Sequence, residues 1–402
     1  MQRKDSKGRN LKTGESQRQD GRYMYRYVDE VSGKRVVVYG LTLQELREQE
    51  KQIARNMSKH ITTDTFVKKI TINDMFKKYM STKNIRDTTR YNYLKLWKNL
   101  VQNTIGNSSL VCFRHSDALA FFAQTANKGY SKATIRTVCS LLEPTFEMAV
   151  NDRIIESNPI TGTAKGFGCN KRTTVSLTSD QEIRLFRFVK SDNVYSKRLP
   201  MLKIMLGTCL RISELAGLTW DDVDMDKKII KITDQVIYGY RSEEKEFFVS
   251  PTKTLSGIRT IPMTKEVYKA FEEQKEINEL LNIKSKNIDN KSNFIFVTRK
   301  GYPVNSSEFF TLINRIIRKF NKNEIIQAEE QHREPELLPR ISAHVFRHTG
   351  CTRMNENNVN PKVMQYVMGH SKLTTTMDTY THVTDMETIK KEFLKVDKTE
   401  MV

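Results

Sequence analysis

The first informative features of this 402-residue sequence are those it lacks. Its five cysteines are scattered, with no Cys-x-x-Cys pair and no histidine at zinc-site spacing, so we expect neither a disulfide framework nor a structural metal. No uninterrupted apolar run approaches the roughly 18 residues of a membrane helix. The opening MQRKDSKGRNLKTGE has no apolar segment of the secretory type. The sequence therefore predicts a cytoplasmic protein with no membrane partner.

Signatures of nucleotide or metal chemistry are missing as well. There is no GxxxxGK[ST] phosphate-binding loop, and no dense group of carboxylates of the kind that two-metal nucleases use. We therefore predict that the protein needs no cofactor and no metal.

Positive charge is abundant. The chain has 67 Lys and Arg against 47 Asp and Glu, a net charge of +20. Such an excess favours a polyanionic partner, and without a membrane segment nucleic acid is the leading choice, although a generic basic protein remains an alternative. With 38% apolar and 28% charged residues the chain is typical of globular proteins, and its length predicts two or three domains.

Residues 1–62 are predicted to form a small basic β module. Residues 1–40 hold ten basic and five acidic side chains, a net charge of +5. The alternation in GRYMYRYVDEVSGKRVVVYG (21–40), with a turn at 29–33, predicts a β-hairpin. Its tyrosine face, Tyr23, Tyr25 and Tyr27, is expected to pack on a helix that starts in TLQE (42–45), where Thr42 and Glu45 form a capping box. The opposite face is expected to meet DNA through four basic side chains: Arg22, Arg26, Lys34 and Arg35.

Residues 68–160 have an all-helical pattern, with predicted helix starts at Thr71, Ser116 and Ser131. Pro159 and three glycines then interrupt the segment 155–175, which predicts a flexible basic linker and a domain boundary. The basic side chains of this linker are candidate DNA contacts: Lys165, Lys171 and Arg172.

Residues 175–385 mix helices with a few strands. Two helical stretches run to about residue 224, strands are predicted at 228–234, 246–250 and 258–263, and helices follow. The predicted fold class is mainly α with small β parts (α+β), in three domains followed by a tail at 386–402.

Three motifs in this region carry charged side chains suited to chemistry. GTCLRISELAGLTW (207–220) places Arg211 one helical turn before Glu214, which by itself could be a structural ion pair. SPTKTLSGIRTIPM (250–263) places Lys253 at a hairpin turn, where a lysine is commonly only solvated. SAHVFRHTGCTRM (342–354) places His344 and Arg347 one turn apart on one helical face.

A fourth motif lies near the end of the chain. Asn360 and Pro361 predict the N-cap and first residue of a helix that ends at Gly369, which leaves His370 at the helix exit. In VMGHSKLTTTMDTYTHV (367–383), Tyr380 lies among polar neighbours, and taken alone it could simply anchor a surface helix.

In chain order these side chains resemble the catalytic set of the tyrosine recombinases, the phage integrase family. The motifs that carry the resemblance are GTCLRISELAGLTW, TKTLSGIRTIP, HVFRHT and MGHSKLTTTMDTYTHV. Residues 175–385 resemble the catalytic domain, residues 68–160 the helical, SAM-like core-binding domain, and LKTGESQRQDGRYMYRYVD the arm-binding domain of conjugative-transposon integrases. One departure is Cys209, where many relatives carry glycine, and we expect it not to affect the chemistry.

The resemblance implies a role for each matching residue. Tyr380 is the expected nucleophile, giving a 3′-phosphotyrosine link and a free 5′-hydroxyl, and Lys253 is the expected general acid. Charge that develops on the phosphate is expected to be stabilised by fixed cations and hydrogen bonds: Arg211, Arg347, His344 and His370. Glu214 is expected to steady Arg211. Because the covalent link conserves the energy of the broken strand, rejoining needs no ATP.

The implied function is that of an integrase that inserts and excises a mobile element. The alternatives are a chromosome or plasmid resolvase of the same family, which usually lacks an arm-binding module, and a non-catalytic DNA-binding relative. The implied partners are double-stranded DNA at core, arm and target sites, a homo-tetramer on two DNAs, and an excisionase. The tail 386–402 has an apolar stripe that predicts docking on a neighbouring protomer or, alternatively, on its own domain.

Overall fold

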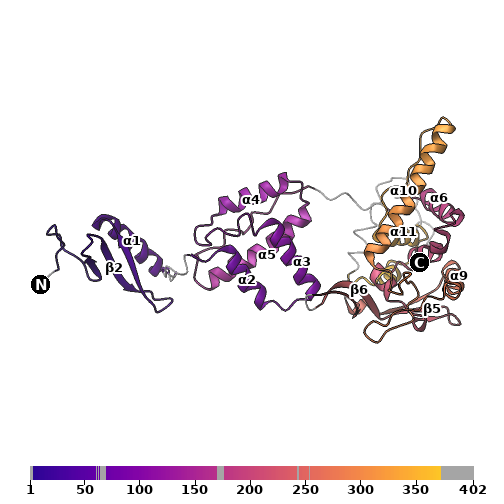
Figure 1. The fold of residues 1–402 in the computed structure, drawn as a ribbon, viewed down its shortest axis with the longest axis horizontal. Helices are drawn as coiled ribbons and strands as arrows, with labels where there is room; N and C mark the ends of the chain where they lie inside the picture. The colour runs from indigo at the N-terminus through magenta and orange to yellow at the C-terminus, as the bar shows by residue number, and fades with distance from the viewer. Residues whose placement is uncertain are drawn as a thin grey trace, which may run out of the picture. The chain divides into compact units, whose positions relative to one another are not determined.

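The computed structural model describes residues 3–59, 61, 63, 69–169, 176–241, 244–252 and 254–372. The chain divides into two compact units, residues 1–172 and residues 173–402 (Figure 1). The predicted fold class, mainly helical with small β parts, is confirmed. Within the described ranges, no helix combines the length and apolar character that crossing a membrane requires.

The first unit opens with an antiparallel sheet of order β1-β2-β3. Its strands are β1 (Glu15–Gln17), β2 (Tyr23–Val28) and β3 (Arg35–Gly40), and the helix α1 (Leu43–Ser58) follows. Pairing of β2 with β3 confirms the predicted hairpin. Thr42 caps α1 by accepting a hydrogen bond from the Glu45 backbone N–H, as predicted, but the Glu45 carboxylate accepts from Leu41 rather than from the Thr42 backbone.

Two of the three tyrosines on one face of this sheet, Tyr23 and Tyr25, pack on α1 as expected, whereas the Tyr27 hydroxyl donates to the Thr63 carbonyl. Tyr23 is buried with Leu43 and Leu46, and Tyr25 packs at the edge of the same cluster. The Tyr23 hydroxyl also donates a hydrogen bond to Asp5 at 2.8 Å, so the residues before β1 are tied to the sheet. The opposite face of β2, which carries Arg26 and Val28, is therefore the exposed one.

The rest of the first unit is helical, with a single core. Its helices are α2 (Ile72–Thr82), α3 (Asp87–Leu100), α4 (His115–Asn127) and α5 (Lys132–Asn151). Thr71 and Ser131 are N-caps, as predicted. Helix α4 begins at His115 with Arg114 as its cap position, so the predicted start at Ser116 was wrong. The Asp117 carboxylate accepts from the Arg114 backbone N–H, and it thereby moves the start of the helix toward the N-terminus.

Part of the predicted linker belongs to this helical core. Ile160 is fully buried, and Thr163 donates a hydrogen bond to its carbonyl. Residues 155–163 therefore extend the helical fold, and the expectation of a linker was wrong for this part, because an apolar side chain among Gly, Pro and Thr is held by the core.

The second unit surrounds α7 (Leu199–Thr208), which is apolar and buried on most sides. The other helices are α6 (Ser179–Ser191), α8 (Ile212–Gly217), α9 (Lys265–Leu281), α10 (Ser306–Glu330), α11 (Ala343–Glu356) and α12 (Pro361–Met368), with short 3-10 turns η2 (Ser196–Arg198), η3 (Trp220–Asp222) and η4 (Leu255–Gly257). Figure 1 shows α11 beside α10, and α9 packs against α7.

Two small antiparallel sheets complete the second unit. One has the order β4 (Val223–Asp224), β5 (Ile229–Ile232), β8 (Arg259–Pro262), and the other pairs β6 (Asp234–Arg241) with β7 (Glu244–Pro251). The predicted strands at 228–234, 246–250 and 258–263 correspond to β5, β7 and β8. Strand β6 was not predicted, because apolar and polar residues do not alternate regularly along DQVIYGYR. The burial of its side chains in the structure is irregular in the same way.

Candidate active site

The structure brings together Arg211, Glu214, Arg347 and His370 from three separate elements of the second unit. Arg211 is the N-cap position of α8, Arg347 lies in α11, and His370 follows α12. As predicted, Asn360 caps α12, Pro361 is its first residue, and Gly369 ends it with φ +61°. Lys253 and Tyr380 lie outside the described residues.

Arg211 is held both at its backbone N–H and at its guanidinium. Glu214 accepts a hydrogen bond from the Arg211 backbone N–H at 3.0 Å, and its other oxygen accepts from Arg211 Nη1 at 2.7 Å. Arg211 Nη2 donates to the Gly369 carbonyl at 3.2 Å. The Arg211 side chain is 31% exposed, so it remains accessible to solvent while Glu214 and Gly369 fix the position of its guanidinium.

Arg347 is almost completely buried, and it lies beside the turn at Gly369 and His370 that follows α12. Its Nη1 donates to the Cys209 carbonyl at 2.6 Å, and its Nη2 contacts both the Met368 carbonyl and His370 Nε2. Burial, followed by the charge of Arg211, lowers the pKa of the Arg347 guanidinium to about 10. The group remains a cation at neutral pH, so two positive charges lie against one helix exit.

His370 is neutral in this arrangement. Burial, followed by the charges of Arg347 and Arg211, lowers the pKa of its imidazole to about 4. Because a guanidinium can only donate, Nε2 of His370 accepts from Arg347 and the ring proton is on Nδ1. His370 therefore carries an N–H donor without adding a third charge.

His344 lies on the same helix as Arg347 but at an exposed position in its first turn. Its ring centroid is 6.4 Å from that of His348. Burial, followed by the charges of His344 and Arg347, lowers the pKa of His348. The one-turn spacing of His344 and Arg347 is as expected, but the two side chains differ strongly in burial.

Arg259 is a component of this site that sequence reasoning missed. Its side chain has no exposed surface, and it donates to Glu214 Oε2 at 3.0 Å, to the Val367 carbonyl at 2.8 Å and to the Gly257 carbonyl at 2.8 Å. It thus connects β8, α8 and the end of α12. The alternation in GIRTIP was the available signal, because Arg259 and Ile261 are buried while the Thr260 between them is exposed.

The buried Glu214 remains ionised because of these partners. Burial alone would raise the pKa of its carboxyl, but the charge and hydrogen bond of Arg259, followed by Arg211, hold that pKa below its usual value. One carboxylate therefore positions one exposed and one buried guanidinium.

Two backbone positions with left-handed φ shape the site. At Gly369 an added Cβ would lie 2.9 Å from Arg259 Nη1, so a side chain there would displace the arginine. Cys209 has φ +53°, a left-handed conformation that glycine adopts more readily than cysteine. Its thiol is buried, which raises its pKa to about 12, and its carbonyl accepts a hydrogen bond from Arg347.

The predicted DNA contacts of the first unit lie on its surface. Arg22, Arg26, Lys34 and Arg35 are exposed, and Arg22 forms an ion pair with Asp20 at 2.7 Å.

Near the helical core, exposed Lys165 lines a groove with Lys132 and Arg136 of α5, two basic residues that sequence reasoning missed. Lys171 and Arg172 lie outside the described residues.

Comparison with known proteins identifies relatives along the whole chain. The sequence profile of the phage integrase family matches residues 176–387, and that of the DNA binding domain of Tn916 integrase matches residues 1–57. The chain is 32% identical over 412 residues to the transposase from transposon Tn916 of Enterococcus faecalis, and equally to the Tn1545 transposase of Streptococcus agalactiae serotype V, with 97% of each chain covered.

A solved structure is similar as well. The Tn1549 transposon integrase in complex with a circular intermediate DNA matches with a TM-score of 0.72 and 30% identity, covering 81% of this chain and 99% of the solved one.

Proposed function

Because this chain belongs to the phage integrase family of tyrosine recombinases, we propose that it inserts and excises its mobile element through a covalent Tyr380 intermediate. It is a DNA breaking and rejoining enzyme, a site-specific recombinase of a mobile element. The match of residues 1–57 to the Tn916 integrase module favours integration over the resolvase alternative.

The observation that carries the proposal is the convergence of Arg211 and Arg347 on the Gly369–His370 turn. When a nucleophile attacks a phosphodiester, negative charge grows on the non-bridging oxygens, and fixed cations stabilise that state. Guanidinium groups suit this because each can donate to two oxygens at once. In the proposal, both arginines bind the scissile phosphate and neutral His370 donates a further hydrogen bond.

The proposed reaction is a transesterification in two directions. The Tyr380 oxygen attacks phosphorus, its proton passes to a nearby base, for which His344 is the candidate, and the 5′-oxygen leaves with a proton from Lys253. The new 3′-phosphotyrosine bond replaces the broken phosphodiester. Attack by a 5′-hydroxyl from the partner strand reverses the step, so neither ATP nor a metal takes part.

The proposal assigns a task to each part of the chain. Residues 1–62 bind arm sites, residues 68–160 and 175–385 clamp core sites, and the tail 386–402 docks on a neighbouring protomer. Four protomers assemble on two DNAs in the bacterial cytoplasm, on the nucleoid, with an excisionase setting the direction. The basic groove of Lys132, Arg136 and Lys165 supports a DNA contact near the helical core.

The test uses a core-site DNA with a nick that lets the 5′-hydroxyl fragment diffuse away. The wild-type chain should accumulate as a covalent complex in the presence of a chelator and without ATP. Tyr380→Phe removes only the hydroxyl and should bind DNA normally without forming the complex, whereas Tyr268→Phe in α9 is the matched control. Covalent complex from Tyr380→Phe, or an absolute need for a divalent metal, would disprove the mechanism.

The general acid is tested separately. Lys253→Ala should slow cleavage about 10²–10⁴-fold, the usual range for losing a general acid. A DNA with sulfur in place of the leaving 5′-oxygen needs no protonation, so it should restore most of the rate. Equal defects on both DNAs would remove Lys253 from this role.

A further inference from the structure

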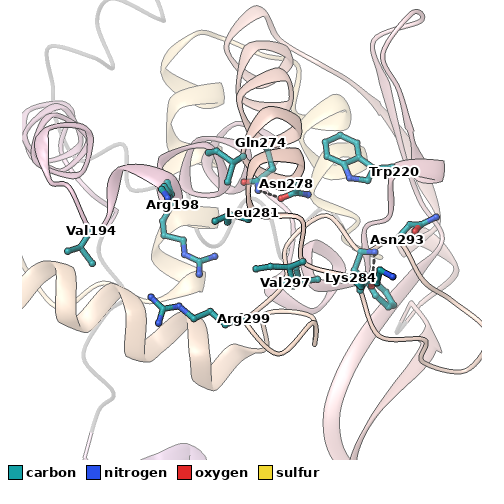
Figure 2. A pocket seen from close by; sticks show the side chains of 15 residues that line it. Val194, Arg198, Trp220, Gln274, Asn278, Leu281, Lys284, Asn293, Val297 and Arg299 are labelled. Atoms are coloured by element: carbon teal, nitrogen blue, oxygen red, sulfur yellow. Dashed lines mark hydrogen bonds between the residues drawn. The ribbon is translucent and has the colours of Figure 1, made fainter.

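The second unit contains a cavity of about 320 Å³ that is separate from the candidate active site. It is lined by the C-terminal half of α9, by η2 and by residues of the segment 283–299 (Figure 2). Neither Arg211, Arg347 nor His370 lines it. Its volume is at the lower end of the range of small-molecule sites, about 300–1,000 Å³.

One side of this cavity is apolar. Trp220, Leu281 and Val297 supply much of this wall, and Figure 2 shows Leu281 and Val297 between Trp220 and the arginines. The Asn278 side-chain amide is fixed by donating to the Ile295 carbonyl at 2.9 Å and accepting from Gln274 at 2.8 Å. An apolar wall with a few fixed polar groups is the usual composition of a ligand site.

The other side carries two guanidinium groups. Figure 2 shows the side chains of Arg198 and Arg299 at the same end of the cavity. Burial, followed by the charge of Arg299, lowers the pKa of Arg198. The charge of Glu308 raises the pKa of Arg198. The Glu308 carboxylate, however, is engaged in capping α10, where it accepts a hydrogen bond from the Asn305 backbone N–H.

Neither guanidinium has a carboxylate partner at ion-pair distance among the residues that the structure describes. Two like charges beside an apolar wall disfavour each other, and an anion between them would relieve the repulsion. Guanidinium is suited to hold phosphate or carboxylate oxygens in pairs. DNA duplex is far too wide for the cavity, so a ligand that fills it is small.

We propose that this cavity binds a small organic anion. Its phosphate or carboxylate lies between Arg198 and Arg299, and its apolar ring packs on Trp220 and Leu281. The site is distinct from the reaction centre and gives the recombinase a place for a small-molecule ligand.

The experiment uses three probes with a common ring: phenyl phosphate, benzoate and neutral benzyl alcohol. Titration is followed by the emission of Trp220 in the full chain with Trp97→Phe, which removes the only other tryptophan. We expect saturable binding of at least one anionic probe and at least about tenfold weaker binding of benzyl alcohol, the effect of losing a charged hydrogen bond. The comparison of phenyl phosphate with benzoate identifies the preferred anion.

Variants locate the binding. Arg198→Gln and Arg299→Gln should each weaken the anionic probe about tenfold or more, whereas Arg318→Gln, an exposed arginine of α10, should not. Arg299 is itself exposed, so its variant is expected to fold, and thermal unfolding checks both. Arg211→Gln should leave the Trp220 response intact.

Three outcomes would overturn the proposal. They are no saturable response to either anion, a response lost with Arg211→Gln but kept with Arg198→Gln, and an Arg198→Gln defect in core-site DNA affinity without any anion binding. Failure here leaves the covalent Tyr380 test unaffected, because the two experiments share neither site nor readout.

Discussion

Arg259 and Glu214 form a fully buried ion pair, 3.0 Å from Nη2 to Oε2, and the same carboxylate holds Arg211. Arg259 also binds the carbonyl of Val367 at 2.8 Å, one turn before His370. The pair therefore fixes the relative positions of α8 and the end of α12, which are the two elements that present Arg211 and His370.

Replacing Arg259 should impair cleavage more than DNA binding. Arg259→Gln leaves Glu214 buried with one partner fewer, and breaking a buried pair costs about 3–5 kcal/mol of stability. At a temperature where the variant is folded, we expect the single-turnover rate of covalent complex formation to fall at least about tenfold, while core-site affinity changes little.

The matched control is Arg241→Gln, which breaks a surface pair with Asp289 and should cost about 0–1 kcal/mol. A normal cleavage rate in folded Arg259→Gln would show that the pair does not position Arg211 and His370. Proportional losses of rate and DNA affinity would also contradict the prediction.

The imidazole of His370 should titrate near pH 4 in the free protein. The folded chain then binds fewer protons than the unfolded chain between about pH 4 and the ordinary value near 6.5, so stability should decline as pH falls through this window. Nuclear magnetic resonance of the histidine ring measures the midpoint, and Arg211→Gln should raise it.

His370→Gln should remove this contribution to the pH dependence of unfolding, whereas His332→Gln, at an exposed position, should leave it in place. A His370 midpoint near 6.5 would contradict the arrangement in which Arg347 donates to Nε2.

Glu50 in α1 should make the N-terminal sheet less stable as pH rises. Burial, followed by the hydrogen bond and charge of Glu15, raises the pKa of Glu50 to about 7. The folded form binds more protons than the unfolded form between about pH 4.5 and 7, so protection should fall by about 1–3 kcal/mol across that window. Amide exchange in β2 and β3, corrected for intrinsic rates, measures it.

Glu50→Gln should flatten this dependence, and Glu48→Gln, exposed on the same helix, should not. Protection that rises from pH 5 to 7 in the wild type would refute the assignment.

The exposed face of β2 and β3 should bind arm-site DNA. Deleting residues 1–60 should abolish arm-site binding and leave cleavage at a core site. Each basic side chain that contacts a phosphate should contribute about 0.9 to the slope of log affinity against log salt. Glutamine substitutions should therefore weaken binding and flatten the slope at four positions: Arg22, Arg26, Lys34 and Arg35.

Lys51 and Arg55 of α1 are the matched control, because they are exposed on the helix rather than on the strands. Equal effects of the two sets of substitutions would assign the binding to net charge rather than to the sheet face.

Sequence alone determined the local features of this protein. The caps at Thr71, Ser131 and Asn360 and the glycine end at Gly369 depend on contacts within a few residues, so a short window contains the physical cause. The motifs could likewise be found without a structure, because the proposed chemistry requires particular types of side chain. The start of α4 was missed because its cap position is Arg114, two residues before Ser116, and the Asp117 carboxylate supports that cap by accepting from the Arg114 backbone N–H.

Tertiary structure decided which of these residues meet. Arg211 binds the Gly369 carbonyl, which lies 158 residues away in the sequence, and Arg347 binds the Cys209 carbonyl, 138 residues away. No local sequence pattern encodes contacts between residues so far apart in the chain. The role of Arg259 depends in the same way on the folded chain. A buried arginine is stable only where distant segments supply its acceptors, and in this protein Glu214, Gly257 and Val367 become neighbours only when α8, β8 and α12 pack together.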